Sequence, residues 1–284
     1  MACDTPLSIH PKGWIKPVDV PCGKCPPCKR RRVNSWVFRL NQQDKISTAS
    51  HFITLTYDTR YIPISSNGFM TLQKRDLQLY WKRLRKSIKT SFPDRDIKIK
   101  FFAVGEYGSK RSRPHYHAIV FNVPDVELFS KAWQLGSVHV GRVSGASLAY
   151  TCKYIDKPSR IPMHSRDDRV PEYSTVSNGI GKNYLTDAIK KYHKADITRN
   201  WVRSDYGTKI ALPRYYRDKI YDDLEKKAQV RHILKVNSIK ENLAYMEYLN
   251  DYGFFDEGFT FDRYMESQKY GRYFHFYKNQ KQRL

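Results

Sequence analysis

The stretch from residue 113 to residue 120 constrains the fold of this chain more than any other. Its sequence, Arg-Pro-His-Tyr-His-Ala-Ile-Val, places two histidines around one bulky residue and continues with apolar residues. Positions two apart on a β-strand point to the same face, so a strand here aims the rings of His115 and His117 at one point. Two aligned neutral imidazoles can hold a divalent ion. The stretch therefore predicts a strand that carries either half of a metal site or two unconnected surface histidines.

Hydrophobic patterns on both sides of this strand predict an α+β fold. The predicted strands are residues 51–57, 97–104, 114–121 and 137–143, and the predicted helices are 71–89, 125–133 and 145–157. The order strand, helix, strand, strand, helix, strand is that of the split βαβ, or ferredoxin-like, type. An antiparallel sheet of this type carries helices on one face and leaves the other face open. His115 and His117 are expected on the open face.

The apolar positions indicate which side of each element faces the core. In the alternating strand 51–57, Ile53 and Leu55 are expected to point inward. Thr71 is expected to cap the first helix. The apolar stripe of that helix has helical spacing and consists of Leu77, Tyr80, Trp81, Leu84 and Ile88.

A catalytic metal needs three protein ligands and at least one open position. Glu106 is the natural third ligand, because counting across the turn places it nearly opposite Pro114 and within a residue of His115. Two imidazoles and a carboxylate suit Mg²⁺ or Mn²⁺ as well as Zn²⁺. The alternative is a solvent-exposed carboxylate that pairs with Lys110 or Arg111.

The predicted helix 145–157 carries a second polar group. At helical spacing, Tyr150, Tyr154 and Lys157 fall within about 60° of one another. Leu148, Cys152 and Ile155 lie on the opposite side, which makes Cys152 a core residue. The tyrosines and lysine form either an ordinary outer face or a catalytic stripe. In the catalytic case, a phenolate attacks a phosphodiester, and Lys153 or Lys157 lowers the tyrosine pKa or neutralises the transition state.

Four cysteines lie close to the N-terminus. Cys22, Cys25 and Cys28 follow at two-residue spacing, and Cys3, with His10 as an alternative, could complete a tetrahedral zinc site. Such a site would be structural, since four protein ligands leave no open position. The alternative is a group of reduced, unliganded thiols.

The charge of the chain indicates a polyanionic partner. Lysines and arginines outnumber aspartates and glutamates by 51 to 28, a formal net charge of +23, and 21 tyrosines accompany them. Basic surfaces with stacking rings suit single-stranded nucleic acid. Candidate DNA contacts are Lys29, Arg30, Arg31, Arg32, Lys110, Arg111 and Arg113. We find no signal peptide or membrane-spanning stretch, so a reducing cytosol is the expected environment.

The chain is expected to consist of a Cys-rich basic segment (1–45), a catalytic core (46–160) and a loop followed by a mainly helical extension (161–284). In this extension 158–183 is predicted to be a loop and 213–249 largely helical, while the last thirty residues lack periodicity. The sequence Gly-Ile-Gly-Lys ending at Lys182 lacks the spacing of a phosphate-binding loop, and we find no motor motif.

Three motifs together resemble those of the HUH superfamily of rolling-circle replication initiators and relaxases. Residues 114–117 are similar to its histidine–bulky–histidine motif, and residues 52–57 resemble its first motif. Residues 150–157 are similar to the third motif in its two-tyrosine form, with a lysine three residues after each tyrosine. The cysteine cluster and residues 105–108 look closest to the replication initiators of microviruses of the gokushovirus type. The resemblance covers roughly residues 1–160.

This resemblance implies a metal-dependent nickase and ligase of origin DNA. It implies a 5′-phosphotyrosine intermediate, later strand transfer, and reliance on a host helicase in the cytoplasm of a bacterium. Two alternatives remain open. The chain could be a plasmid relaxase or single-strand transposase of the same superfamily, or a non-catalytic protein that binds or packages single-stranded DNA.

Overall fold

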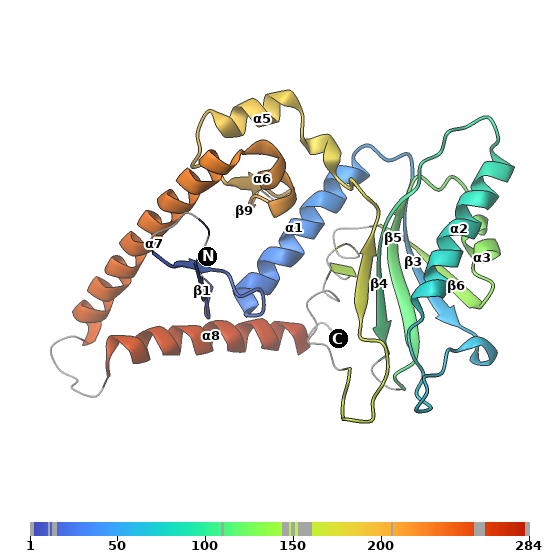
Figure 1. Cartoon of the computed structure of the whole chain (residues 1–284), viewed down its shortest axis with the longest axis horizontal. Coiled ribbons are helices and arrows are strands. Elements are labelled where there is room, and N and C mark those ends of the chain that lie inside the picture. Colours follow the sequence, from blue (N-terminus) through green and yellow to red (C-terminus); the bar gives the residue numbers. More distant parts are fainter. Residues whose placement is uncertain are drawn as a thin grey trace. The chain divides into compact units, whose positions relative to one another are not determined.

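A five-stranded antiparallel sheet forms the centre of residues Ser35–Thr186 in the computed structural model of the chain (Figure 1). Its strands lie in the order β6-β3-β5-β4-β7. They are β3 Ser50–Tyr57, β4 Lys100–Tyr107, β5 Pro114–Phe121, β6 Gly136–Arg142 and β7 Tyr173–Val176. The predicted α+β class with an antiparallel sheet is confirmed. The strand predicted at 97–104 begins later, at Lys100, because β5 ends at its partner Phe121 and offers residues 97–99 no position to pair with.

The structure describes the chain apart from residues 1–2, 11, 13–15, 109–110, 144–147, 149–150, 153–160, 206, 253–258 and 282–284. The chain divides into two compact units, Met1–Asn34 with Asp187–Leu284, and Ser35–Thr186. These units are defined by packing alone. The segments 1–45, 46–160 and 161–284 therefore stay a prediction about function.

Two helices cover one face of the sheet, α2 Lys74–Ser91 and α3 Glu127–Ala132 (Figure 1). The buried residues of α2 are Leu77, Tyr80, Trp81, Leu84 and Ile88, as its spacing predicts. They share one hydrophobic core with Ile53 and Leu55 of β3. The ring of Trp81 stacks on that of Phe101 with 3.9 Å between centroids. The apolar pattern therefore identified the core side of these elements correctly.

The start of α2 differs from the prediction. Its N-cap is Gln73, whose side chain accepts a hydrogen bond from the Arg75 amide. Thr71 is buried, and its hydroxyl instead accepts a hydrogen bond from the Val170 amide at 2.9 Å. The amide of Leu72 is bonded to the hydroxyl of Tyr107. These tertiary hydrogen bonds hold the chain extended and delay the helix.

The opposite face of the sheet is not open, contrary to the prediction. Phe102, Val104 and Ile119 on this face are all buried. Trp36, on helix α1 (Pro26–Asp44), contacts Phe102 with ring centroids 5.0 Å apart. The segment 1–45 was not predicted to contain a helix, so the second layer that this helix supplies was missed. The histidine-bearing face is thus partly enclosed.

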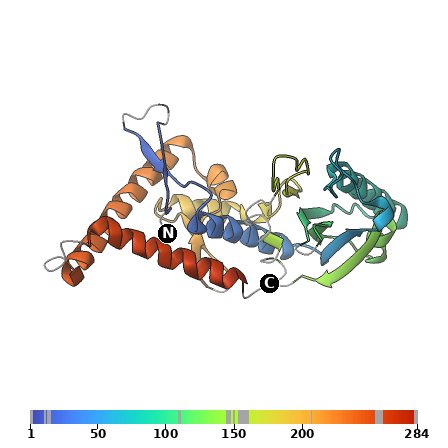
Figure 2. The ribbon, with the colours of Figure 1, turned by 90° about the horizontal axis from the view of Figure 1, so that it is seen from below.

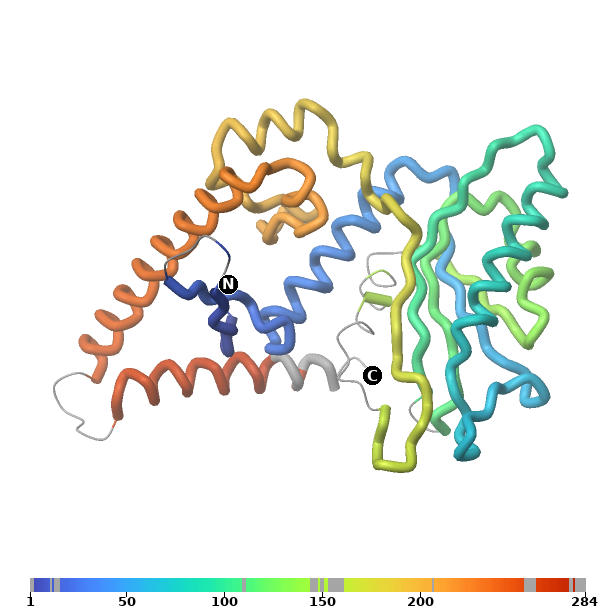
Figure 3. Tube along the Cα trace, in the orientation of Figure 1, coloured from blue at the N-terminus to red at the C-terminus, as the bar shows by residue number. Residues whose placement is uncertain are grey.

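Residues predicted to be a loop contribute the fifth strand. β7 pairs with β4, with Phe102 opposite Val176, and Figure 3 traces it along that edge. Before β7, a buried ion pair joins Arg169 to Asp167 at 2.7 Å. The Tyr107 hydroxyl donates to the Val170 carbonyl at 2.7 Å. These contacts fix the segment against the edge of the sheet.

The described part of the other unit consists mainly of helices, as predicted for the C-terminal region (Figure 2). The elements after β7 are α5 Asp187–Lys194, α6 Arg214–Ile220, α7 Asp223–Tyr252 and α8 Phe261–Lys281. Short strand pairs are β1 Leu7–Ile9 with β2 Val18–Val20, and β8 Trp201–Arg203 with β9 Lys209–Ala211. Single 3₁₀ turns span Thr59–Tyr61 and Lys182–Tyr184. Helix α8 was not predicted, because its aromatic residues form no stripe. Across the described residues, no helix combines the length and apolar character needed to cross a membrane.

Candidate metal-binding and catalytic site

The predicted hairpin register is confirmed, and it brings Glu106 to the histidine strand. Glu106 lies opposite His115, and Val104 lies opposite His117. The carboxylate of Glu106 reaches diagonally to its second neighbour, with 2.8 Å between its Oε1 and Nε2 of His117. Both residues are only 8% exposed. Glu106 is therefore not the solvent-exposed carboxylate of the alternative interpretation.

Each histidine is also held from behind by a threonine of β3. Thr54 lies opposite His117 and Thr56 opposite His115 in the register. Their hydroxyl oxygens lie 3.0 Å and 3.3 Å from the Nδ1 atoms of these rings. The two hydrogen bonds turn both Nε2 atoms away from β3. These threonines were not predicted as site residues, although their alternate spacing matches that of the histidines.

A threonine partner suits both tautomers of His117. When Nε2 carries the proton, it donates to Glu106, and Nδ1 accepts from Thr54. When Nε2 is a metal ligand, Nδ1 carries the proton and Thr54 accepts it, because a hydroxyl can both donate and accept. A hydrogen bond to the second nitrogen is how proteins commonly orient a metal-binding histidine.

Neighbouring groups restrict the two rings further. The ring of Phe52 stacks on that of His117 at an angle of 6°, with 5.9 Å between centroids. A side chain at Gly108 would place its first carbon 3.3 Å from Nε2 of His115. Burial, followed by the nearby His117, holds the pKa of His115 below its ordinary value and so favours the neutral form. A neutral ring is the form that can bind a metal.

The three predicted ligands do not form a closed cluster. Glu106 and His117 are in contact, whereas His115 lies beside this pair on the same face of the sheet. Within the part of the chain that the structure describes, only the four cysteines bring three or more potential ligand atoms within reach of a single ion. The histidine site therefore consists of one contacting pair and one neighbouring ring.

The predicted catalytic stripe lies outside the described residues, since Tyr150, Lys153, Tyr154 and Lys157 are among those not described. The described residues of this stretch, Leu148, Thr151 and Cys152, are helical and buried. Burial of Leu148 and Cys152 confirms the predicted core side of the helix. Its tyrosine side stays a prediction.

The predicted DNA contacts are found in different settings. Arg113 donates through Nη2 to the Tyr57 carbonyl at 2.6 Å, so it braces the end of β3. Arg111 is exposed, and Lys110 lies outside the described residues. The run from Lys29 to Arg32 lies on α1, half-buried at Lys29 and exposed at Arg30, Arg31 and Arg32. A role in DNA binding stays a prediction for all of them.

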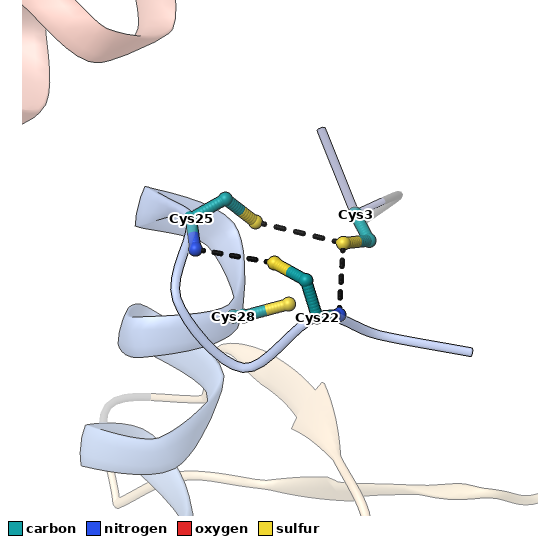
Figure 4. Close-up of side chains that lie close together, drawn as sticks. All are labelled: Cys3, Cys22, Cys25 and Cys28. Atoms are coloured by element: carbon teal, nitrogen blue, oxygen red, sulfur yellow. Dashed lines mark hydrogen bonds between the residues drawn. The ribbon is translucent and has the colours of Figure 1, made fainter. Parts of the chain in front are cut away.

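The four N-terminal cysteines converge, as Figure 4 shows. Their sulfur atoms all lie within 4.8 Å of one another, and all four are free thiols. Burial raises the pKa of Cys28 to about 12. Burial also acts to raise the pKa of Cys22, but hydrogen bonds from the Thr5 hydroxyl and two amides outweigh it and lower that pKa to about 6. His10, the alternative fourth ligand, is exposed and does not belong to the cluster.

The comparisons with known proteins agree with the resemblance drawn from the motifs. Residues 50–159 match the family model of the replication-associated protein ORF2. This range includes Glu106, both histidines and the predicted tyrosine helix. The chain is related to phage replication-associated proteins. The recognition of this relationship from the sequence is thereby confirmed.

Three curated relatives carry the same description. The chain is 29% identical to replication-associated protein ORF2 of Spiroplasma virus 4, over 84% of this chain and 83% of the relative. It is 28% identical to replication-associated protein VP4 of Bdellovibrio phage phiMH2K, over 70% of this chain and 66% of the relative. It is 25% identical to replication-associated protein ORF4 of Chlamydia phage 1, over 70% and 53%. No solved structure matches the chain significantly.

Proposed function

We propose that this chain initiates rolling-circle replication of a phage genome by nicking single-stranded origin DNA. The observation that carries the proposal is the contact between Glu106 and His117 inside the matched range 50–159. It joins a carboxylate and an imidazole, two metal-ligating groups, in the part of the chain related to replication proteins. The names of the three relatives favour replication over plasmid mobilisation or transposition.

The proposed ligands of a catalytic Mg²⁺ or Mn²⁺ are His115, His117 and Glu106. The donor set fits these ions, since two neutral imidazoles and one carboxylate leave several coordination positions for phosphate and water. When bound, the ion would polarise the scissile phosphate and stabilise charge on the leaving oxygen. Thr54 and Thr56 hold the rings by Nδ1 and leave Nε2 for this purpose.

The proposed nucleophile is Tyr150 or Tyr154. Its phenolate oxygen attacks the phosphorus and forms a phosphotyrosine bond, while the bond from phosphorus to the 3′ oxygen breaks. The leaving oxygen takes up a proton and becomes a 3′ hydroxyl. Lys153 and Lys157 would stabilise the phenolate and the transition-state charge. Attack of a 3′ hydroxyl on the phosphotyrosine reverses the step and rejoins the strand.

The proposal includes partners beyond the cleaved strand. The exposed arginines of the Lys29–Arg32 run, together with Arg111, would contact phosphates, as expected for a chain of net charge +23. Separation of the parental strands is assigned to a helicase of the bacterial host. The proposed place of action is the cytoplasm of that host.

The proposal also extends to the fold type. Strands β6-β3-β5-β4 form the order expected if β3, α2, β4, β5, α3 and β6 make one split βαβ unit. In this arrangement, β7 is an addition at the edge next to β4. A central position of β3 and β5 suits the site, since it holds both histidines and both threonines on neighbouring strands.

Covalent capture of DNA tests the proposed function. The full chain is incubated with Mn²⁺ and with single-stranded oligonucleotides that tile the genome encoding it. We expect a metal-dependent covalent adduct on one oligonucleotide, and mass mapping should locate it on Tyr150 or Tyr154. Cleavage with an adduct on neither tyrosine would contradict the tyrosine mechanism. No cleavage of any oligonucleotide would favour a non-catalytic binding protein.

A His117→Ala variant separates catalysis from DNA binding. We expect it to abolish adduct formation while salt-sensitive DNA binding changes little, because phosphate contacts come from the wider basic surface. The matched control is His232→Ala, which changes a histidine of α7 outside the candidate site. Equal loss of activity in both variants would contradict the assignment of the site.

A further inference from the structure

The geometry of the cysteine cluster points to a bound metal ion, and we infer that Cys3, Cys22, Cys25 and Cys28 bind one structural Zn²⁺. The Sγ atoms of Cys3 and Cys25 lie 3.7 Å apart. A zinc–sulfur bond of about 2.3 Å gives a tetrahedron whose edges are about 3.8 Å. All the other sulfur pairs lie within 4.8 Å. Closing these pairs to tetrahedral edges requires only small movements of the side chains.

The backbone around the cluster is shaped to stabilise thiolates (Figure 4). The amide of Cys22 donates to Sγ of Cys3 at 3.2 Å. The amides of Lys24 and Cys25 both donate to Sγ of Cys22 at 3.3 Å. Gly23 between them has a φ of 75°, which permits the tight turn. Amide hydrogen bonds to sulfur favour the charged form, the form that binds zinc.

The position of the cluster at the start of α1 adds to this stabilisation. Cys25 directly precedes the helix, and Cys28 lies in its first turn. The first turn contains no acidic residue, so no carboxylate offsets the positive end of the helix. Four thiolates and one Zn²⁺ carry a net charge of −2, which would supply the missing negative charge. The following basic run, beginning at Lys29, would be attracted to the same charge.

The segment that contains the cluster has little hydrophobic core. Among its described residues from 3 to 25, the buried apolar side chains are Val18 and Cys25. Leu7 and Ile9 of β1 are exposed instead. Small segments without a sufficient core are usually held by disulfides or a metal. The observed fold of this segment is therefore the fold expected of a zinc-stabilised one.

Other uses of four cysteines fit less well. Two disulfides would require sulfur pairs in bonding contact, whereas all four thiols are free and the sulfurs of Cys3 and Cys25 are 3.7 Å apart. An iron–sulfur cluster places several atoms between its cysteine ligands and so separates their sulfurs further than a single ion does. Four sulfurs within 4.8 Å of one another match a single tetrahedral ion.

The cluster is connected to the C-terminal helix of the same unit. Asp4, the residue after Cys3, is almost fully buried and accepts two hydrogen bonds from the Arg272 guanidinium of α8, the shorter at 2.8 Å. Zinc binding by Cys3 would fix Asp4 in this position. The metal would thereby stabilise the docking of α8 as well as the N-terminal segment.

Metal analysis of the purified full chain tests the inference. We expect about one Zn²⁺ per chain, retained through dialysis against EDTA at neutral pH and released when a mercurial reagent titrates the thiols. Hydrogen exchange of α8 should increase after release, while that of α2 stays unchanged. Chain that binds iron instead, or that holds no zinc after expression with added zinc, would overturn the inference.

Two variants identify the ligands. Cys28→Ser should lose the zinc, whereas Cys152→Ser, a change at the buried cysteine of the other unit, should retain it. Because Cys28→Ser could fail to fold, Co²⁺ substitution of the unaltered chain provides a second measurement. We expect the intense visible absorption of tetrahedral Co²⁺ with four thiolates. Weak octahedral absorption would overturn the inference. These readouts do not depend on DNA cleavage, so they stand apart from the proposed function.

Discussion

Nε2 of His117 lies 2.8 Å from Oε1 of Glu106, between two strands whose register places Glu106 opposite the other histidine. A carboxylate oxygen and an imidazole lone pair repel each other at this distance. A positive charge is therefore required between them, either a proton on Nε2 or a metal ion. With both side chains about nine-tenths buried, water screens this requirement poorly. The pair is thus a site that selects for cations.

Replacing Glu106 with Gln tests whether the carboxylate binds the ion. The amide oxygen can still accept the hydrogen bond from His117, so we expect thermal stability to change little. Loss of the charge should weaken Mn²⁺ binding and slow DNA nicking by roughly 100-fold. Calorimetric Mn²⁺ titration and a nicking assay measure the two effects. Unchanged Mn²⁺ affinity would show that Glu106 is not a ligand.

Removal of the Thr54 hydroxyl tests the orientation of His117. In Thr54→Val the side chain keeps its shape but loses the hydrogen bond to Nδ1. We expect a roughly 10- to 100-fold loss of metal affinity, the effect of losing such a partner elsewhere. The free energy of unfolding should fall by about 1 kcal/mol. Thr54→Ser, which retains a hydroxyl, should restore most of the affinity, and equal loss in both variants would contradict the orienting role.

The elements around this site could be predicted because their patterns are local. Strand β5 has the predicted bounds, and the apolar stripe of α2 coincides with its buried residues. The position of Glu106 followed from a count across one turn, since neighbouring strands of a hairpin share a register. Convergence of the four cysteines was also foreseeable, because three of them are close in sequence.

Features that depend on distant segments could not be predicted. The burial of Phe102 needs Trp36, which lies far from it in the sequence. β7 is a four-residue strand whose sequence is too short to be recognised without its partner β4. Thr71 has the chemistry of a helix cap, but Val170 uses its hydroxyl instead. In each case a contact between separate segments overrides the local preference.

The titration of His115 gives a prediction for pH dependence. Burial and the nearby His117 hold its pKa below the ordinary value of 6.5, and the opposing effect of Glu106 is outweighed. The unfolded chain therefore takes up a proton at this position at higher pH than the folded chain does. The stability that neutral His115 contributes is fully present above 6.5 and is lost as the pH falls through the lowered pKa.

Two measurements check this pH dependence. NMR titration of the His115 ring should give a midpoint below 6.5. The unaltered chain should also lose more stability between about pH 7 and 5 than the His115→Gln variant does. A midpoint at or above the ordinary value would contradict the prediction. Because a protonated ring cannot bind a metal, the lowered pKa should also keep the site competent in mildly acidic solution.

A methyl group at position 108 would press on the second histidine. The added carbon of Gly108→Ala would lie 3.3 Å from Nε2 of His115, closer than most such contacts, so the ring must shift. We expect Mn²⁺ binding to weaken by about 10-fold and nicking to slow accordingly, because metal sites depend on ligand placement. The shift should also be visible as a change in the NMR signals of the His115 ring.

The matched control for this variant is Gly271→Ala. An added carbon there meets no atom within 4 Å, and the residue lies within helix α8. We expect unchanged metal binding and a gain in stability of up to about 1 kcal/mol, since alanine favours a helix over glycine. If Gly108→Ala also left both metal affinity and the His115 signals unchanged, the ring could not be confined by the turn. The two variants together thus separate the effect of an added methyl group from its position beside the ligand.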